Sequence, residues 1–269
     1  MREDGYHNIE TFMQTVSAYD LIKIESSEKF QFSSVGYDFP EDEENLCVKA
    51  FRLFTEYTGI KRPVKIELEK HIPVGAGLGG GSSDAAAIIR GLNDIWGCGL
   101  NNEELSSVGA KIGSDVPFFL QAVTGAAMCS GHGEIVETYH PVFTGHVIIV
   151  FTGQNISTKW AYKNIDENLI NFKKNVNLKR YILQDFPAKK GLNGLKNDFS
   201  KIVFGQFREL EKIVTALNEQ GSVYSSLSGS GSAVFGLFTD EMKAERAYNS
   251  LPDFVFKAIG DTPAPFNTI

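Results

Sequence analysis

A glycine-rich segment between residues 73 and 84 has the composition of an anion-binding loop. It reads Pro-Val-Gly-Ala-Gly-Leu-Gly-Gly-Gly-Ser-Ser-Asp, with five glycines within residues 75–81. Because glycine has no Cβ, its backbone can turn successive N–H groups toward an anion. The alanine run 85–87 follows at once and favours a helix. We therefore predict a phosphate cradle over residues 75–83, at a helix N-terminus whose unpaired N–H groups and dipole favour a phosphate.

Two other phosphate-binding patterns fit this segment less well. Gly75, Gly77 and Gly80 have the dinucleotide spacing, but about 20 residues further on the segment 98–104 predicts a helix start, not the acidic end of a strand. No Gly-Lys-Ser/Thr follows the glycines, so the P-loop pattern fails. A glycine-rich surface loop without a ligand stays open as the alternative.

Asp115, in the segment Gly-Ser-Asp-Val-Pro-Phe-Phe over residues 113–119, is the candidate for proton transfer. A carboxylate beside a γ-phosphate can orient a substrate hydroxyl and take its proton, and an adjacent cation would keep the acid ionised. Phosphoryl transfer otherwise needs mainly positioning and charge neutralisation. On residue types alone, an N-cap or turn former is the favoured interpretation of an Asp two residues before a proline.

Two further segments complete the candidate chemistry. Residues 226–232 form a second glycine-rich segment, Ser-Leu-Ser-Gly-Ser-Gly-Ser, and an Asp-Gly turn near the start of the chain ends in Tyr6 and His7. From the residues alone, a flexible hairpin loop and an exposed turn stay open as the structural alternatives.

Together these segments resemble the kinase superfamily of galactokinase, homoserine kinase, mevalonate kinase and phosphomevalonate kinase (GHMP), and within it the diphosphocytidyl-methylerythritol kinases. The resemblance is carried by the loop at 73–84, by Arg-x-Asp-Gly-Tyr-His at 2–7, by Gly-x-Asp-Val-Pro at 113–117 and by the second glycine-rich segment. It implies an α+β fold of two domains, with an ATP-binding domain over residues 1–143 and a smaller ferredoxin-like domain over residues 144–269.

The resemblance also implies a role for each matching residue. Asp115 would be the catalytic base, and Tyr6, His7, Thr158 and Tyr162 would hold the cytidine of the substrate through stacking and hydrogen bonds to the base edge. ATP would be held by Pro73, Val74, Gly75, Ala76, Gly77, Leu78, Gly79, Gly80, Gly81, Ser82, Ser83, Asn45, Leu46, Gly229 and Gly231. For Asn45 and Leu46 the alternative is an N-cap with a core leucine, and for Thr158 and Tyr162 it is a structural role.

The implied activity is ATP-dependent phosphorylation of the 2-hydroxyl of 4-diphosphocytidyl-2-C-methyl-D-erythritol, with Mg²⁺ carried on the nucleotide and no protein metal site. Two alternatives remain. Another kinase of the superfamily would have no use for Tyr6 and His7. A catalytically impaired nucleotide-binding protein is the other, because the family's first strand, with a lysine that pairs with the catalytic aspartate, has no counterpart ahead of the turn at 2–7.

The whole chain has the composition of a globular protein that binds small molecules. Its 269 residues are 42% hydrophobic and carry a net charge of −7, which argues against a nucleic-acid backbone or an anionic membrane as the partner. The polar N-terminus predicts no secretory segment. Cys47, Cys98 and Cys129 lack metal-ligand spacing, and we interpret them as reduced thiols of a cytoplasmic protein. We expect a monomer or a weak homodimer.

The elements that must position these residues follow from apolar periodicity. The first helix of the phosphate cradle should begin among Ser82, Ser83 and Asp84, which are good N-cap types, and end near Trp96. Further helices are predicted over 46–57, 102–112, 204–217 and 242–251. Strands are predicted over 8–17, 20–25, 29–35, 64–70, 147–151 and 254–259, with a turn between two strands at 131–134.

Overall fold

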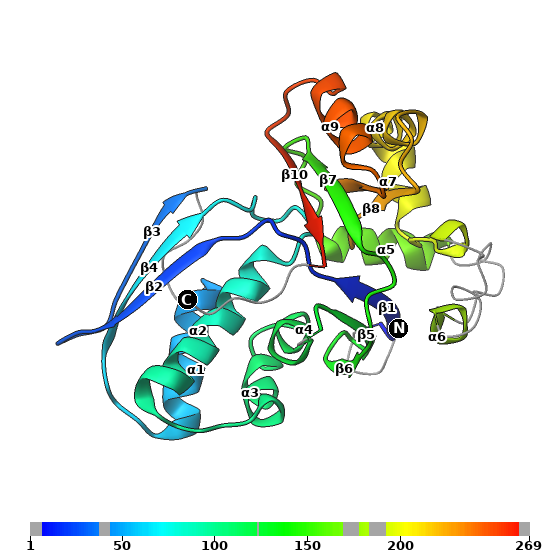
Figure 1. Ribbon diagram of the computed structural model, residues 1–269. Coiled ribbons are helices and arrows are strands. Elements are labelled where there is room, and N and C mark those ends of the chain that lie inside the picture. Colours follow the sequence, from blue (N-terminus) through cyan, green and yellow to red (C-terminus); the bar gives the residue numbers. More distant parts are fainter. Residues whose placement is uncertain (1–6, 38–43, 123, 169–177, 183–191, 264–269) are drawn as a thin grey trace.

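The computed structural model describes residues 7–37, 44–122, 124–168, 178–182 and 192–263 (Figure 1). The strands are β1 Ile9–Gln14, β2 Leu21–Ser26, β3 Gln31–Gly36, β4 Val64–Lys70, β5 Ala126–Gly131, β6 Ile135–Thr138, β7 Gly145–Phe151, β8 Tyr224–Leu227, β9 Val234–Phe238 and β10 Phe256–Thr262. The helices are α1 Leu46–Thr58, α2 Gly80–Trp96, α3 Asn102–Gly109, α4 Val116–Gln121, α5 Thr158–Asn168, α6 Leu178–Arg180, the 3-10 turn Leu192–Gly194, α7 Ser200–Gln206, α8 Arg208–Glu219 and α9 Glu241–Ser250.

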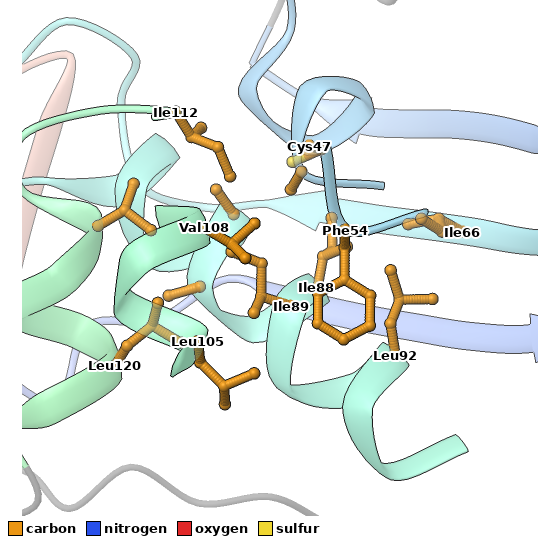
Figure 2. Packing of buried hydrophobic residues seen from close by; sticks show 14 of the residues in the cluster. Cys47, Phe54, Ile66, Ile88, Ile89, Leu92, Leu105, Val108, Ile112 and Leu120 are labelled. Atoms are coloured by element: carbon orange, nitrogen blue, oxygen red, sulfur yellow. The ribbon is translucent and has the colours of Figure 1, made fainter. Parts of the chain in front are cut away.

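The largest core lies between the sheet β2-β4-β3 and the helices α1 and α2. Strand β4 alternates as its sequence predicts, and Val64, Ile66 and Leu68 are each at most 2% exposed. Figure 2 shows Ile66 lying beside Phe54 of α1 and Ile88 of α2, so strand and helices meet in one apolar cluster. The apolar side of α2, from Ala85 to Trp96, packs in this core. The core therefore fixes the position of the α2 N-terminus.

A second sheet has the order β1-β5-β6 and lies next to α4 (Figure 1). Strand β1 pairs antiparallel with β5, with Ile9 opposite Gly131 and Gln14 opposite Ala126. The predicted turn at 131–134 joins β5 to β6. This turn lies beside the start of α4, since a Cβ built on Gly133 would come within 3.1 Å of Ser114 Cβ.

The third sheet, β10-β7-β9-β8, is antiparallel throughout and has two apolar faces. Ile148 and Val150 of β7 face a core shared with α8 and α9. The alternate residues Val147, Ile149 and Phe151 face the other way, toward Ala76 and Leu78 of the first glycine-rich loop. The later part of the chain therefore packs against this loop.

The segment that follows β1 is hydrogen-bonded to the end of β10, the last strand of the described chain. Ser17 N donates to the carbonyl of Asp261 at 2.9 Å, and Thr262 Oγ1 donates to the carbonyl of Thr15 at 2.7 Å. Gln14 Nε2 donates to Thr262 Oγ1 at 2.8 Å. The connection from β1 to β2 is thus hydrogen-bonded to β10.

Three predicted helices differ from those observed. Helix α2 begins at Gly80 rather than among Ser82 to Asp84, because Gly79 takes a left-handed conformation (φ 71°) and caps the helix without a side chain. The predicted helix at 204–217 is two helices, α7 and α8, since the backbone leaves the helical region at Phe207 (φ −120°, ψ 76°). Helix α3 ends at Gly109, short of residue 112.

None of the helices that the structure describes is long and apolar enough to cross a membrane.

Candidate active site

The first glycine-rich loop runs from the end of β4 to the start of α2. Gly75, Gly77 and Gly79 all have positive φ (71°, 79° and 71°), which L side chains rarely adopt. A Cβ on Gly77 would come within 2.6 Å of the Ser228 carbonyl oxygen, and a Cβ on Gly80 within 2.9 Å of Ile72 Cγ2. The glycines are therefore required by conformation and by close contact. The first N–H groups of α2 are left for a ligand, because no side chain caps this helix.

The second glycine-rich loop packs directly on the first. Ser228 Oγ donates to the carbonyl of Gly77 at 2.7 Å, and Ala233 N donates to the carbonyl of Ala76 at 2.8 Å. A Cβ on Gly231 would come within 2.9 Å of Leu227 Cδ1. The structure thus brings together two glycine-rich segments that are far apart in the sequence. Ser228 and Gly77, which share this hydrogen bond, are 151 residues apart.

Asn197 holds the second loop in place. Its Nδ2 donates to the carbonyls of Leu227 at 2.9 Å and Gly229 at 2.8 Å, while its Oδ1 accepts from Phe199 N at 2.9 Å. Sequence reasoning did not assign Asn197 a role in the site. The available signal was its place just ahead of α7, where an Asn can accept from the backbone two residues on.

Asp115 occupies the N-cap position of α4 with φ −88° and ψ −11°, and its side chain caps none of the helix N–H groups. Pro117 follows in the first turn, where a proline N causes no loss of a hydrogen bond. The carboxylate is left available for a ligand. Burial raises the pKa of Asp115 above the ordinary range of an aspartate, because desolvation penalises its charged form.

His7 and Tyr162, which line the same cleft, form a stacked pair. Their ring centroids are 4.5 Å apart at an interplanar angle of 14°. Phe199 contacts Tyr162 edge-on at 5.0 Å. His7 Nε2 lies 2.8 Å from Asp166 Oδ1, so an imidazole protonated at Nε2 donates to that carboxylate and keeps Nδ1 as an acceptor. Tyr6 lies outside the described residues.

Electrostatics and a hydrogen bond connect this pair to the other parts of the site. Burial raises the pKa of the Tyr162 phenol, and the negative charge of Asp115 raises it further. Thr158, on the same helix, is exposed, with its Oγ1 3.3 Å from Ser230 Oγ of the second glycine-rich loop. Asp115, Tyr162 and that loop therefore belong to one site.

Asn45 and Leu46 lie at the start of α1. Asn45 is 5% exposed, and its Oδ1 accepts from Cys47 N at 2.8 Å, which is the N-cap arrangement. Leu46 is half-buried and reaches α2, since a Cβ on Gly81 would come within 3.4 Å of Leu46 Cδ1. Both residues therefore have a structural role beside the loop.

A single cleft of about 3750 Å³ joins these parts. Ten of the predicted site residues line it, namely His7, Gly77, Leu78, Gly79, Ser82, Ser83, Asp115, Thr158, Tyr162 and Gly229. The remaining described ones, Asn45, Leu46, Pro73, Val74, Gly75, Ala76, Gly80, Gly81 and Gly231, lie outside its lining. Within the described ranges, no group of three or more His, Cys, Asp and Glu side chains could hold a metal ion.

The amino-acid sequence resembles known kinases over almost its whole length. Residues 45–122 match the GHMP kinases N terminal domain, and residues 183–257 match the GHMP kinases C terminal domain. The 4-diphosphocytidyl-2-C-methyl-D-erythritol kinase of Pelodictyon phaeoclathratiforme is 40% identical over 272 residues, which cover 98% of this chain and 91% of that protein. The chain belongs to the 4-diphosphocytidyl-2-C-methyl-D-erythritol kinase family of the GHMP kinases.

Further relatives of this GHMP kinase agree. The protein of the same name from Chlorobium chlorochromatii is 40% identical over 251 residues, covering 93% of this chain and 87% of that protein. A crystal structure of 4-(cytidine 5'-diphospho)-2C-methyl-D-erythritol kinase superposes with a TM-score of 0.81 at 29% identity, covering 98% of this chain and 93% of that one. L. major mevalonate kinase, at 19% identity and a TM-score of 0.71, shares the fold. The two-domain α+β architecture expected from sequence is thereby confirmed.

The two family matches divide the site of this kinase unevenly. The first contains the glycine-rich loop and Asp115, and the second contains Asn197 and the second loop. His7, Thr158 and Tyr162 lie outside both matched ranges. The stacked pair therefore lies outside the ranges that the two superfamily models match.

Proposed function

We propose that this kinase transfers the γ-phosphoryl group of ATP to the 2-hydroxyl of 4-diphosphocytidyl-2-C-methyl-D-erythritol. The observation that supports it most directly is the shared cleft, which is lined by the glycine-rich loop, by Asp115 and by the His7–Tyr162 pair. A phosphate-binding loop and an aromatic pair in one cleft suit a nucleotide donor and a cytidine-bearing acceptor, and Asp115 in the same cleft suits a base that acts on the acceptor hydroxyl.

The triphosphate is bound by backbone groups of residues 75–83 and of the second loop. Their N–H groups and the α2 dipole stabilise negative charge without side-chain rearrangement. Gly229 lines the cleft and faces the triphosphate, with Gly231 in the same loop but outside the cleft lining. The family resemblance proposes Asn45 and Leu46 as neighbours of the adenine, and in the structure they lie at the start of α1, outside the cleft lining. Mg²⁺ is carried on the nucleotide, where it neutralises charge on the β- and γ-phosphates. With the charge neutralised in this way, the main task of the protein is to position the two reactants.

Asp115 is the general base. As the substrate oxygen bonds to the γ-phosphorus, the bond from that phosphorus to the bridging oxygen of ADP breaks, and the hydroxyl proton passes to Asp115. The raised pKa makes the carboxylate a stronger base than an exposed aspartate. Its free N-cap geometry supports this role, because no backbone N–H group competes for the proton-accepting oxygen.

The cytidine end is held by Tyr6, His7, Thr158 and Tyr162. Tyr162 offers a stacking face, and Phe199 fixes its orientation by edge contact. His7 Nδ1, left as an acceptor by the Asp166 contact, suits a donor group on the base edge. Homoserine or mevalonate would make no use of this pair.

The remaining assignments follow from the same picture. We propose a cytoplasmic enzyme that acts on small molecules, with neither a nucleic acid nor a membrane as partner, and that is a monomer or a weak homodimer. The free thiols of Cys47, Cys98 and Cys129 suit a reducing compartment. The two domains divide near residue 143, between β6 and β7.

The test is ADP formation by the purified chain with ATP, Mg²⁺ and 4-diphosphocytidyl-2-C-methyl-D-erythritol, with the phosphorylated product identified by ³¹P NMR. Cytidine diphosphate should compete with the acceptor substrate, whereas mevalonate and homoserine should give no turnover. Tight ATP binding without ADP formation, in the presence of the cytidyl substrate, would contradict the proposal and favour an impaired nucleotide-binding protein.

A further inference from the structure

Three charged side chains are buried beneath the first glycine-rich loop. Lys70 ends β4, Asp20 precedes β2 and Asp84 lies in α2; their side chains are 3%, 1% and 4% exposed. Lys70 Nζ donates to Asp84 Oδ2 at 2.7 Å and to Asp20 Oδ2. Burying charges is costly, and apolar residues of the same size are often at least as stable. Stability alone therefore does not account for the cluster.

The cluster contacts both ends of the loop. Asp20 Oδ1 accepts from the backbone N–H groups of His71 at 2.6 Å and Ile72 at 2.8 Å, the two residues that lead into Pro73. At the other end, Asp84 is part of α2, and Lys70 Nζ lies 3.0 Å from the position of a Cβ on Gly80, the first residue of that helix. One set of side chains thus joins the entry of the loop to its exit.

The loop needs such external anchors. A run of glycines has many backbone conformations of similar energy, so its binding geometry must be imposed by contacts outside it. Gly79 receives no side-chain cap, and the second glycine-rich loop contacts only the middle of the segment, at Ala76 and Gly77. The ends of the segment are held by the charged cluster.

We propose that Asp20, Lys70 and Asp84 are positioning residues, which fix the entry and exit of the phosphate loop relative to each other and so determine its affinity for the triphosphate. The inference rests on the proposed ATP site. It makes none of the three a catalytic residue, because they act on the nucleotide through the loop backbone and, for Asp84, through the charge in the first turns of α2.

The cluster has one cation for two carboxylates, so its charge depends on pH. Burial raises the pKa of Asp84 to about 7, against the opposing effect of Lys70. The other groups that face it are Asp20, from the connection ahead of β2, and the buried Cys47 thiol of α1. When Asp84 ionises, a negative charge is added in the first turns of α2, which disfavours a bound phosphate. Nucleotide affinity should therefore fall as the pH rises through 7.

Two alanine variants test the anchors without leaving a lone buried charge. D20A keeps the Lys70–Asp84 pair and removes the acceptor at the loop entry, while D84A keeps the Lys70–Asp20 pair and removes the link to α2. Binding of the β,γ-imido analogue of ATP, with Mg²⁺, is measured by calorimetry. A separate titration with cytidine diphosphate measures the fraction of protein that is folded and able to bind at the cytidine end of the site. We expect each variant to bind the analogue about tenfold more weakly and cytidine diphosphate unchanged. E69A, which alters an exposed neighbour on β4, is the matched control.

The conservative variant D84N tests whether the contact with Lys70, rather than the charge of Asp84, is needed for nucleotide affinity. Its amide oxygen can still accept from Lys70, so we expect analogue affinity near that of the original protein, without its fall between pH 6 and pH 8. If D20A and D84A bind the analogue within twofold, or if D84N keeps the pH dependence, the inference is wrong. Should one alanine variant not fold, the other is compared with E69A and decides. A starting protein that does not bind the analogue would instead contradict the proposed function.

Discussion

The Gly77 carbonyl oxygen accepts a hydrogen bond from Ser228 Oγ at 2.7 Å, which joins the two glycine-rich loops directly. The contact is so close that a Cβ on Gly77 would come within 2.6 Å of the Ser228 carbonyl oxygen. The two loops therefore form one structural unit, although they belong to different domains. A change in either loop should alter nucleotide binding by both.

The variant G77A should abolish tight nucleotide binding. The left-handed backbone costs an alanine about 1–2 kcal/mol, and the Cβ would also push the loops apart. We expect at least about a tenfold loss of affinity for the ATP analogue, measured by calorimetry. G97A is the control, because Gly97 has a similar φ of 65° but nothing within 4 Å of its Cβ position. Equal effects of the two substitutions would show that backbone strain, not loop contact, is responsible.

Replacing Asn197 by aspartate should loosen the second loop. N197D keeps the acceptor for Phe199 N but loses both donors to the carbonyls of Leu227 and Gly229. At about 1 kcal/mol for each of the two hydrogen bonds, the KM for ATP should rise by up to about 30-fold. N218D, an exposed asparagine of α8, provides the matched control. An unchanged KM in N197D would mean that the loop holds its shape without this side chain.

D115N should remove the base without disturbing the ATP site. General base catalysis contributes roughly 10²–10⁴-fold, so kcat should fall by that factor while the affinity for the ATP analogue stays within about twofold. Since burial raises the pKa of Asp115, kcat/KM of the original protein should rise with pH and level off above that pKa. The same limb should be missing from the residual activity of D115N. Full turnover by D115N would exclude Asp115 as the base.

The ring at position 162 should determine affinity for the cytidyl substrate. Stacking of a base on an aromatic ring contributes about 1–3 kcal/mol, so Y162A should weaken cytidine diphosphate binding by about 5- to 150-fold. Y162F keeps the ring and its contact with Phe199, and should bind normally. Fluorescence or calorimetric titration measures both. If Y162A and Y162F lose affinity equally, the phenol group rather than stacking is responsible.

Asp84 should also make stability depend on pH. Its folded-state pKa is raised from 3.8 to about 7, so the folded chain holds this proton more tightly than the unfolded chain. Its contribution therefore favours the folded state at low pH and is lost as the pH rises from about 4 to 7. The urea midpoint of D84N should fall less over this window than that of the original protein. A parallel pH dependence in both proteins would contradict this assignment.

The sequence predicted the site best where a residue type strongly favours one local structure. Glycines with positive φ and the alternation of Val64, Ile66 and Leu68 predicted the loop and the strand that leads into it. The start of α2 was predicted wrongly, because residue types favour a Ser or Asp cap, whereas Gly79 caps by backbone conformation alone. Chain direction at such a point depends on tertiary contacts.

The buried cluster shows what sequence could have indicated further. Lys70 continues the inward alternation of β4, and a lysine on a buried face requires a carboxylate partner. Its partners, Asp20 and Asp84, are 50 and 14 residues away, and no local pattern connects them. The pairing of Ser228 with Gly77 is similarly invisible until the fold is known. The break at Phe207 also arises from tertiary packing, since the apolar stripe of 204–217 continues through it.

The hydrogen bonds between residues 15–17 and 261–262 bear on how the two halves could be separated. One backbone cut between β6 and β7 would leave the first fragment without the β10 partner of its early segment, and the second with an uncovered final strand. Producing either half alone would therefore require moving β10 to a new chain position, as in a circular permutation, rather than simple truncation.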